Sequence, residues 1–93
     1  MASKVSNKLE RKCDTFQRAL GAAITELRIK QGWRYQYVAQ RVGCSEEYMN
    51  GIEHGQRNPT MDLLARIAHL HSLKLAQLLA LGERKYKRGR KKK

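Results

Sequence analysis

The stretch from Arg34 to Pro59 constrains the fold of this chain more than any other part of its sequence. It reads RYQYVAQRVGCSEEYMNGIEHGQRNP. Apolar residues recur at helical spacing on both sides of Gly43, and the second helical segment leads into a loop that begins at Gly55. Ser45 can cap that second segment, because its hydroxyl can accept a hydrogen bond from a first-turn amide. The pattern predicts two short helices joined by a glycine turn, which is a helix-turn-helix arrangement.

The remaining apolar residues predict a compact all-α domain of five helices. One apolar stripe predicts a helix that starts near Asp14 or Thr15 and ends at Gly32; it consists of Phe16, Leu20, Ala23, Ile24 and Leu27. The other helices are expected at about 34–42, 45–54, 60–71 and 75–81. A single proline and a low aromatic content disfavour a sheet of many short strands.

The net charge of +12 is concentrated at the two ends of the chain. Residues 84–93 contain eight Lys and Arg residues and no acid, whereas residues 13–83 contain eight basic and seven acidic residues. A block of like charges repels itself. We therefore expect a basic N-terminal arm at 1–13, a five-helix domain at 14–83 and a disordered basic tail at 84–93. A polyanion such as nucleic acid would be attracted mainly by these flexible basic termini.

Neither the cysteines nor the histidines form a metal-binding pattern. Cys13 and Cys44 match no metal-ligand or redox spacing, so we expect both to be reduced, with Cys44 filling apolar space and a redox switch as the alternative. His69 and His71 fall on different faces of one helix, and we expect His71 beside the core with a hydrogen-bonded ring. The sequence shows no catalytic pairing and no phosphate-binding glycine loop. We therefore expect no metal, no cofactor and no enzymatic activity.

No apolar run approaches the roughly 18 residues that a membrane-spanning helix needs. The N-terminus, MASKVSNKLERK, also lacks the apolar core of a signal peptide. These two features predict a cytoplasmic protein.

The exit from the second helix of the motif carries a specific pattern, I-E-H-G-Q-R-N-P, from Ile52 to Pro59. It resembles the I-E-x-G-x-R-x-P exit of the phage repressor and Cro family, also called the Xre family, and the likeness runs from Leu20 to about Leu79. The other matching residues are Leu27-Arg28, Gly32, Val38-Ala39, Gly43-Cys44-Ser45, Leu64 and Ile67-Ala68. Family members are five-helix DNA-binding domains, so the resemblance implies a repressor-like domain. Periodicity alone would equally fit two adjacent helices of a simple bundle.

The resemblance also implies where side chains lie on duplex DNA, with the second helix of the motif in the major groove. It places Ser45, Glu46, Glu47 and Gly51 toward the bases, Tyr48 and His54 toward the DNA backbone, Arg34, Tyr35 and Gln36 at a phosphate, and Gln56 and Arg57 in a loop near the backbone. Asn50 is a further candidate, because its amide can pair with adenine. The resemblance also implies a partly buried ion pair between Arg28 and Glu53.

Ser45, Glu46, Glu47 and Gly51, which the resemblance places toward the bases, form the reading face of this helix. This reading face departs from the family pattern. Relatives commonly carry Gln, Arg, Ser or Thr at the positions of Glu46 and Glu47. One hypothesis is that a carboxylate here accepts a hydrogen bond from cytosine N4, and the other is that both acids stabilise the helix dipole and point away from the bases. Gly51 offers no side chain for readout and costs the helix about 1 kcal/mol relative to alanine.

These features predict a sequence-specific transcriptional regulator of bacterial or phage origin that binds duplex DNA and is nucleoid-associated. The leucine-rich last helix favours a homodimer through Leu75, Leu78 and Leu79 on a palindromic operator. The alternative is a protein-interaction module, antitoxin-like or an adaptor, with only non-specific nucleic-acid binding through its tails. RNA binding through the basic tails is a third option.

The cations of the tail are expected to act as a sequence-independent tether. They are Arg84, Lys85, Lys87, Arg88, Arg90, Lys91, Lys92 and Lys93. Arg88-Gly89-Arg90 resembles the core of a minor-groove AT-hook without the proline that normally follows. Minor-groove insertion and simple solubilisation are therefore alternatives to the tether.

Overall fold

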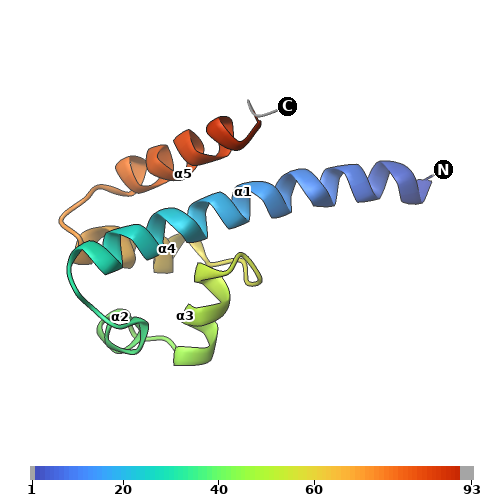
Figure 1. The fold of residues 1–93 in the computed structure, drawn as a ribbon. Coiled ribbons are helices and arrows are strands. Elements are labelled where there is room, and N and C mark those ends of the chain that lie inside the picture. Colours follow the sequence, from blue (N-terminus) through green and yellow to red (C-terminus); the bar gives the residue numbers. More distant parts are fainter. Residues whose placement is uncertain (1, 91–93) are drawn as a thin grey trace.

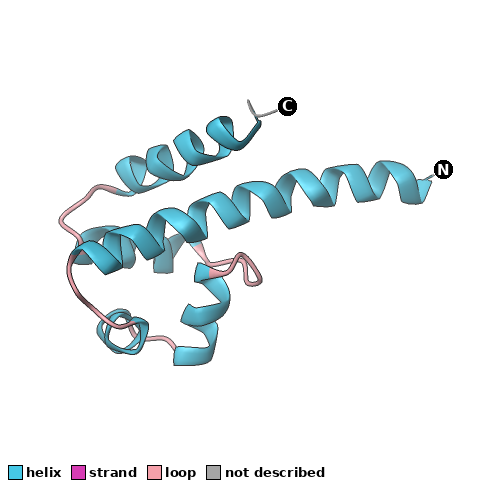
Figure 2. Cartoon of the chain, viewed as in Figure 1, coloured by secondary structure: helices cyan, strands magenta, loops and turns pink. Residues whose placement is uncertain are grey.

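Five helices make up the regular structure of residues 2–90 (Figure 1). The structure is a computed structural model that describes the backbone of residues 2–90 and the side chains of residues 16–87. The helices are α1 (Ala2–Lys30), α2 (Tyr35–Val42), α3 (Glu46–Glu53), α4 (Met61–Leu70) and α5 (Leu75–Arg90). Between residues 2 and 90 the helices are joined by loops and turns only, with no strand (Figure 2). The expected all-α, five-helix domain is confirmed.

The two terminal helices are longer than the sequence pattern indicated. Helix α1 begins at Ala2 and not near Asp14, because no proline or glycine interrupts residues 2–20. Helix α5 continues through Gly82 to Arg90 and runs antiparallel to α1 (Figure 1). The first part of the basic segment 84–93 is therefore helical, and Lys91, Lys92 and Lys93 lie outside the described residues.

Contacts with α1 explain why α5 continues through Gly82, past its expected end at about residue 81. The glycine is buried, and a Cβ at this position would lie 2.9 Å from Leu20 Cδ1. Beyond it, Lys85 Nζ pairs with Glu26 Oε2 at 2.6 Å, and the Tyr86 ring meets Phe16 edge to face at 5.7 Å. Gly82 is thus a contact point between two helices, where the lack of a side chain permits close approach.

The apolar core lies where all five helices meet. Its buried residues are Leu20 and Ile24 from α1, Val38, Ala39 and Val42 from α2, Met49 and Ile52 from α3, Leu63, Leu64, Ile67 and Ala68 from α4, and Leu78 from α5. Each large side chain stabilises the fold by about 1.5–3 kcal/mol. The core therefore holds the two helices of the motif against the other three.

Three leucines of α5 pack into or against this core. Leu78 is fully buried, and Leu75 and Leu79 pack partly buried against the core. The large apolar side chains that are exposed between residues 16 and 87 are Ile29, Tyr37 and Met61, none of which lies on α5. The leucine content of α5 is therefore explained by its packing on α1 and α4, and a dimer interface centred on Leu78 is not possible in this fold.

Helices α1 and α3 cross at Gly21. A Cβ on Gly21 would lie 2.4 Å from the Ile52 carbonyl oxygen and 2.7 Å from that of Glu53. Both contacts are with backbone, so neither can be relieved by turning a side chain. This crossing brings the end of α3 directly onto α1.

His71, at the end of α4, lies beside the core against Trp33. The two rings are 5.2 Å apart and inclined by 35°. Both ring nitrogens are buried without a hydrogen-bond partner, so the expectation of a hydrogen-bonded ring is wrong. Burial lowers the pKa of His71 below its usual range, because the charged imidazolium loses hydration there.

The stability of the domain is expected to fall as the pH drops below about 6.5. Because the pKa of His71 is lowered in the folded state, the unfolded chain binds a proton at higher pH than the folded chain does. Lowering the pH therefore decreases the free energy of unfolding. The fall should end once the pH is below the folded pKa. Thermal melts of the wild type and of His71→Leu between pH 5 and 8 test this, with the variant expected to show a flatter profile. Equal slopes for the two proteins would contradict it.

Candidate nucleic-acid interface

The turn of the motif forms as the sequence predicts. Gly43 ends α2 in a left-handed conformation with φ 82°, and its amide donates to the Ala39 carbonyl. Ser45 caps α3, with its Oγ accepting a hydrogen bond from the Tyr48 amide at 3.0 Å. Val38, Ala39 and Val42 of α2 share one core with Met49 and Ile52 of α3. The two helices are therefore packed firmly against each other, and the outer face of α3 is exposed to solvent.

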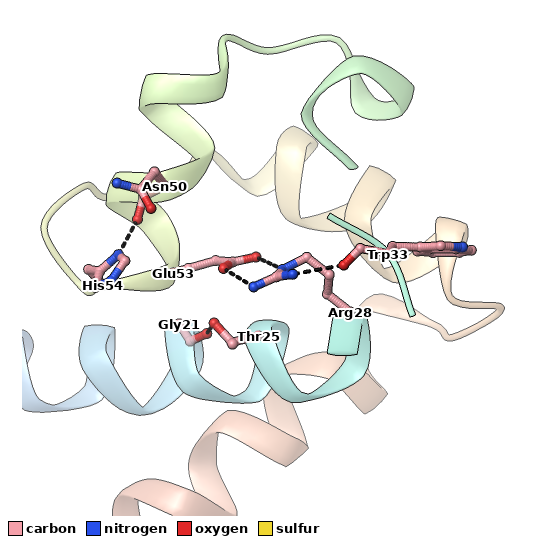
Figure 3. A network of polar contacts seen from close by, with 7 residues as sticks. All are labelled: Gly21, Thr25, Arg28, Trp33, Asn50, Glu53 and His54. Atoms are coloured by element: carbon pink, nitrogen blue, oxygen red, sulfur yellow. Dashed lines mark hydrogen bonds and ion pairs between the residues drawn. The ribbon is translucent and has the colours of Figure 1, made fainter. Parts of the chain in front are cut away.

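The ion pair between Arg28 and Glu53 is present and orients α3 (Figure 3). Arg28 Nε donates to Glu53 Oε2 at 2.7 Å and Nη2 donates to Oε1 at 3.0 Å, while Nη1 donates to the Trp33 carbonyl at 2.8 Å. The Glu53 side chain is only 4% exposed. One guanidinium therefore ties together the end of α1, the loop before α2 and the end of α3.

The start of α3 carries the acidic part of the outward face. Ser45, Glu46 and Glu47 are exposed. The two carboxylates lie in the first turn, where the helix dipole stabilises negative charge. Among the described residues neither carboxylate takes part in an ion pair. The placement is compatible with both hypotheses for these acids.

Asn50 and His54 stand together near the end of α3 (Figure 3). His54 Nδ1 lies 2.8 Å from the Asn50 carbonyl oxygen. Because a carbonyl only accepts, we assign a proton to Nδ1, which leaves Nε2 for an outside partner. His54 is exposed and Asn50 is half-buried.

Tyr48 is used mainly to hold the exit loop. Its hydroxyl donates to the Asn58 carbonyl at 3.0 Å, and a phenol has only one proton to give. The side chain is half-buried. A direct hydrogen bond from Tyr48 to a phosphate would therefore require it to release the loop.

Gly51, which the resemblance placed toward the bases, is covered by the exit loop. It is buried, and the position of a Cβ would be 2.4 Å from Arg57 Cγ. The exposed residues Gln56 and Arg57 both direct their amides at the Gly51 carbonyl, at 2.7 and 3.2 Å. The exit loop therefore folds back over the middle of α3 and covers the glycine.

The start of α2 offers free backbone donors. Arg34, in the N-cap position, has φ −90° and ψ 152° and makes no side-chain capping bond, whereas Ser45 and Thr60 cap α3 and α4 with their hydroxyls. Arg34 is exposed, while Tyr35 and Gln36 are half-buried, with Tyr35 packed against the core. Uncapped amides at a helix N-terminus attract anions.

The predicted contact residues of the two helices share one depression of the surface. Arg34 and Gln36 from the start of α2 line it together with Ser45 and Glu46 from the start of α3. The structure thus brings these four residues together. Tyr35 differs from them, because its ring is turned toward the core.

Three supporting residues were not identified from the sequence. Gly21 permits the crossing of α1 and α3, and its position inside an apolar helical stripe was the only available signal. Gln17 Nε2 donates to the Gly55 carbonyl at 3.1 Å, and Arg66 Nη1 donates to the Val42 carbonyl at 3.1 Å. Neither polar contact has a local sequence pattern, because each joins residues far apart in the chain.

The described part of the chain offers no arrangement for metal or thiol chemistry. No group of three or more His, Cys, Asp or Glu side chains there could hold a metal ion. Burial raises the pKa of the Cys44 thiol, which disfavours the reactive thiolate. The side chain of Cys13 lies outside the described residues.

Over the described residues, no helix is both long and apolar enough to cross a membrane.

Comparisons with known proteins agree with this geometry. The helix-turn-helix domain family matches residues 19–81. The chain is 36% identical over 62 residues to the HTH-type transcriptional regulator AnsR of Bacillus subtilis, covering 67% of this chain and 53% of AnsR. It is 32% identical over 53 residues to y4dJ of Sinorhizobium fredii, an uncharacterized HTH-type transcriptional regulator, covering 57% of this chain and 69% of y4dJ. The chain thus spans about half the length of AnsR.

A solved structure shares the arrangement of the helices. The clp gene regulator ClgR of Corynebacterium glutamicum superposes with a TM-score of 0.72 at 25% sequence identity, covering 76% of each chain. The resemblance to helix-turn-helix regulators seen in the sequence is therefore confirmed. The same matches support the expectation that the chain is not an enzyme.

Proposed function

This chain belongs to the helix-turn-helix domain family, and we propose that it is a transcriptional regulator that reads duplex DNA with α3 in the major groove. The observation that carries the proposal is the way α3 is held. Its inner face is fixed by the core and by the Arg28–Glu53 pair, and its outer face, from Ser45 to His54, is left accessible. A major groove about 12 Å wide admits a helix presented in this way.

The start of α2 supports a second contact with the same duplex. The uncapped amides of its first turn and the exposed Arg34 lie at the surface depression that α3 borders. Phosphate contacts fix the register of a DNA-binding protein without reading its sequence. We therefore assign Arg34 and the first-turn amides of α2 to a phosphate, and the outer residues of α3 to the bases.

The distribution of charge supports separate roles for α3, which would supply sequence preference, and for residues 84–93, which would supply most of the affinity. Residues 13–83 are nearly neutral, with eight basic and seven acidic residues, and one basic side chain, Arg28, is committed to Glu53. The tether proposed for residues 84–93 would supply most of the salt-dependent affinity. In this proposal α3 supplies sequence preference, including any contact of Glu46 or Glu47 with cytosine.

A selection from random duplexes tests the function. The wild type is expected to select one consensus, and truncation after Lys87 is expected to weaken binding equally on all duplexes while keeping that consensus. The cut removes Arg88, Arg90 and three lysines but spares the contacts of Lys85 and Tyr86 with α1. Each lost phosphate contact should make the negative slope of log binding constant against log salt concentration shallower by about 0.9.

The outcome also decides between this function and its alternative. Glu46→Ala and Glu47→Ala should shift the selected consensus if these acids read bases and leave it unchanged if they only stabilise the helix. Loss of all binding with the tail would favour a protein-interaction module instead. Equal affinity for duplex DNA and structured RNA would favour RNA binding.

A homodimer on a palindromic operator is a further part of the proposal. Two recognition helices would then lie about 34 Å apart, one turn of DNA. Because Leu78 is fully buried, such a dimer would have to use the outward residues of α5 or another surface. Sedimentation at micromolar concentration tests it, and a monomer there would contradict it.

A further inference from the structure

The middle of α3 is unusual because a loop residue covers it. Gly51 lies inside a helix, where glycine costs about 1 kcal/mol relative to alanine. The position of a Cβ there would be 2.4 Å from Arg57 Cγ, 3.4 Å from its Cβ and 3.6 Å from its Cδ. The aliphatic stem of Arg57 therefore fills the space that a side chain at position 51 would occupy.

The loop is fixed on both sides of Arg57. The Gly51 carbonyl accepts the amides of Gln56 and Arg57, at 2.7 and 3.2 Å. On the other side, Tyr48 donates to the Asn58 carbonyl at 3.0 Å. Both anchors belong to α3, so the backbone of Arg57 moves with that helix and not as a free loop.

The guanidinium of Arg57 is available for a ligand. Arg57 is exposed, and within the described residues its side chain makes no hydrogen bond or ion pair. By contrast, Arg28 is bound to Glu53, and Arg66 is bound to Asp62 and the Val42 carbonyl. Arginine presents donors in a fixed fork that matches guanine O6 and N7.

We propose that Arg57 completes the reading face of α3 and contacts a guanine in the major groove, with Gly51 as the positioning residue that lets it cross the helix. This inference rests on the proposed function. It supplies the reading face with a cationic donor that the acidic start of the helix lacks. It also explains why a glycine stands at a position that the family resemblance directs toward the bases.

Substitution at Gly51 should act through Arg57. A Cβ at position 51 requires Arg57 Cγ to move, and the smallest such change is a turn about χ1 into another staggered well. That turn moves the aliphatic stem of Arg57 off α3 and changes the position of the guanidinium that it carries. The variants for the test are Arg57→Ala, Gly51→Ala and the double variant, with Lys30→Ala as a control for loss of one exposed cation.

The experiment measures affinity for the duplex selected by the wild type and for its single-base-pair variants. Arg57→Ala is expected to lower affinity for the consensus by about 5- to 150-fold and to remove the preference at one G·C pair. Gly51→Ala should remove the same preference, and the double variant should be no weaker than Arg57→Ala. Lys30→Ala should change affinity for all duplexes alike.

Three results would overturn the inference: a loss for Arg57→Ala that is uniform over all base pairs, separate and additive effects of the two substitutions, or preferences at different base pairs. Thermal melts verify that Gly51→Ala is folded. If it is not, Arg57→Lys replaces it and should keep the charge but weaken the G·C preference, because lysine lacks the planar fork of donors. A wild type that selects no consensus would refute the proposed function itself, whereas the three results above refute only this inference.

Discussion

Replacement of Glu53 by alanine is expected to lower the free energy of unfolding by about 3–5 kcal/mol, because it strands the buried charge of Arg28. The Arg28 side chain is only 16% exposed, and two of its nitrogens now donate to the carboxylate at 2.7 and 3.0 Å. The free energy of unfolding of a native domain is about 5–15 kcal/mol in total, so this loss would be a large part of its stability. Urea unfolding of the two proteins measures it.

The exposed pair of Asp62 and Arg66 provides the control. Its oxygen and nitrogen are 3.1 Å apart, but the side chains are 79% and 57% exposed. Asp62→Asn should therefore change stability by about 0.5 kcal/mol or less. The double variant Arg28→Met with Glu53→Leu should recover most of the loss of Glu53→Ala, since it leaves no unpaired charge. A cost for Glu53→Ala no larger than that for Asp62→Asn would refute this account.

Local patterns in the sequence predicted the centre of the fold correctly. The turn at Gly43 and the cap at Ser45 depend on residues within four positions of one another, so their chemistry is visible in a short window. The Arg28–Glu53 pair joins distant residues, and only the family resemblance indicated it. The core positions followed from helical periodicity, because each helix buries one stripe.

The features that the sequence patterns missed are tertiary contacts and the full length of α1. Leu78 was assigned to a dimer interface together with Leu75 and Leu79, but it is buried in the core of its own chain. Helical periodicity does not distinguish a core position from an interface position. The cover over Gly51 was missed because a helical position does not reveal that a loop residue six positions later returns over it. The extension of α1 to Ala2 was missed because its sequence there is polar and lacks a clear apolar stripe.

Replacement of Gly21 by valine is expected to cost more than about 3 kcal/mol, at the upper end for overpacked positions. The added Cβ alone would lie 2.4 and 2.7 Å from the carbonyl oxygens of Ile52 and Glu53, and valine adds two methyl groups to it. For a domain of this size the loss corresponds to a fall in Tm of at least about 12 °C. Thermal unfolding followed by circular dichroism measures it.

The neighbouring exposed residue gives a matched control, since Ala22→Val introduces the same side chain on the solvent face of α1. It should cost only the difference in helix propensity, about 0.5 kcal/mol. Gly21→Ala should also destabilise the domain, although alanine favours helix by about 1 kcal/mol. If Gly21→Ala instead raised Tm, α1 and α3 could separate without loss. Close crossing would then not be what holds Glu53 within reach of Arg28.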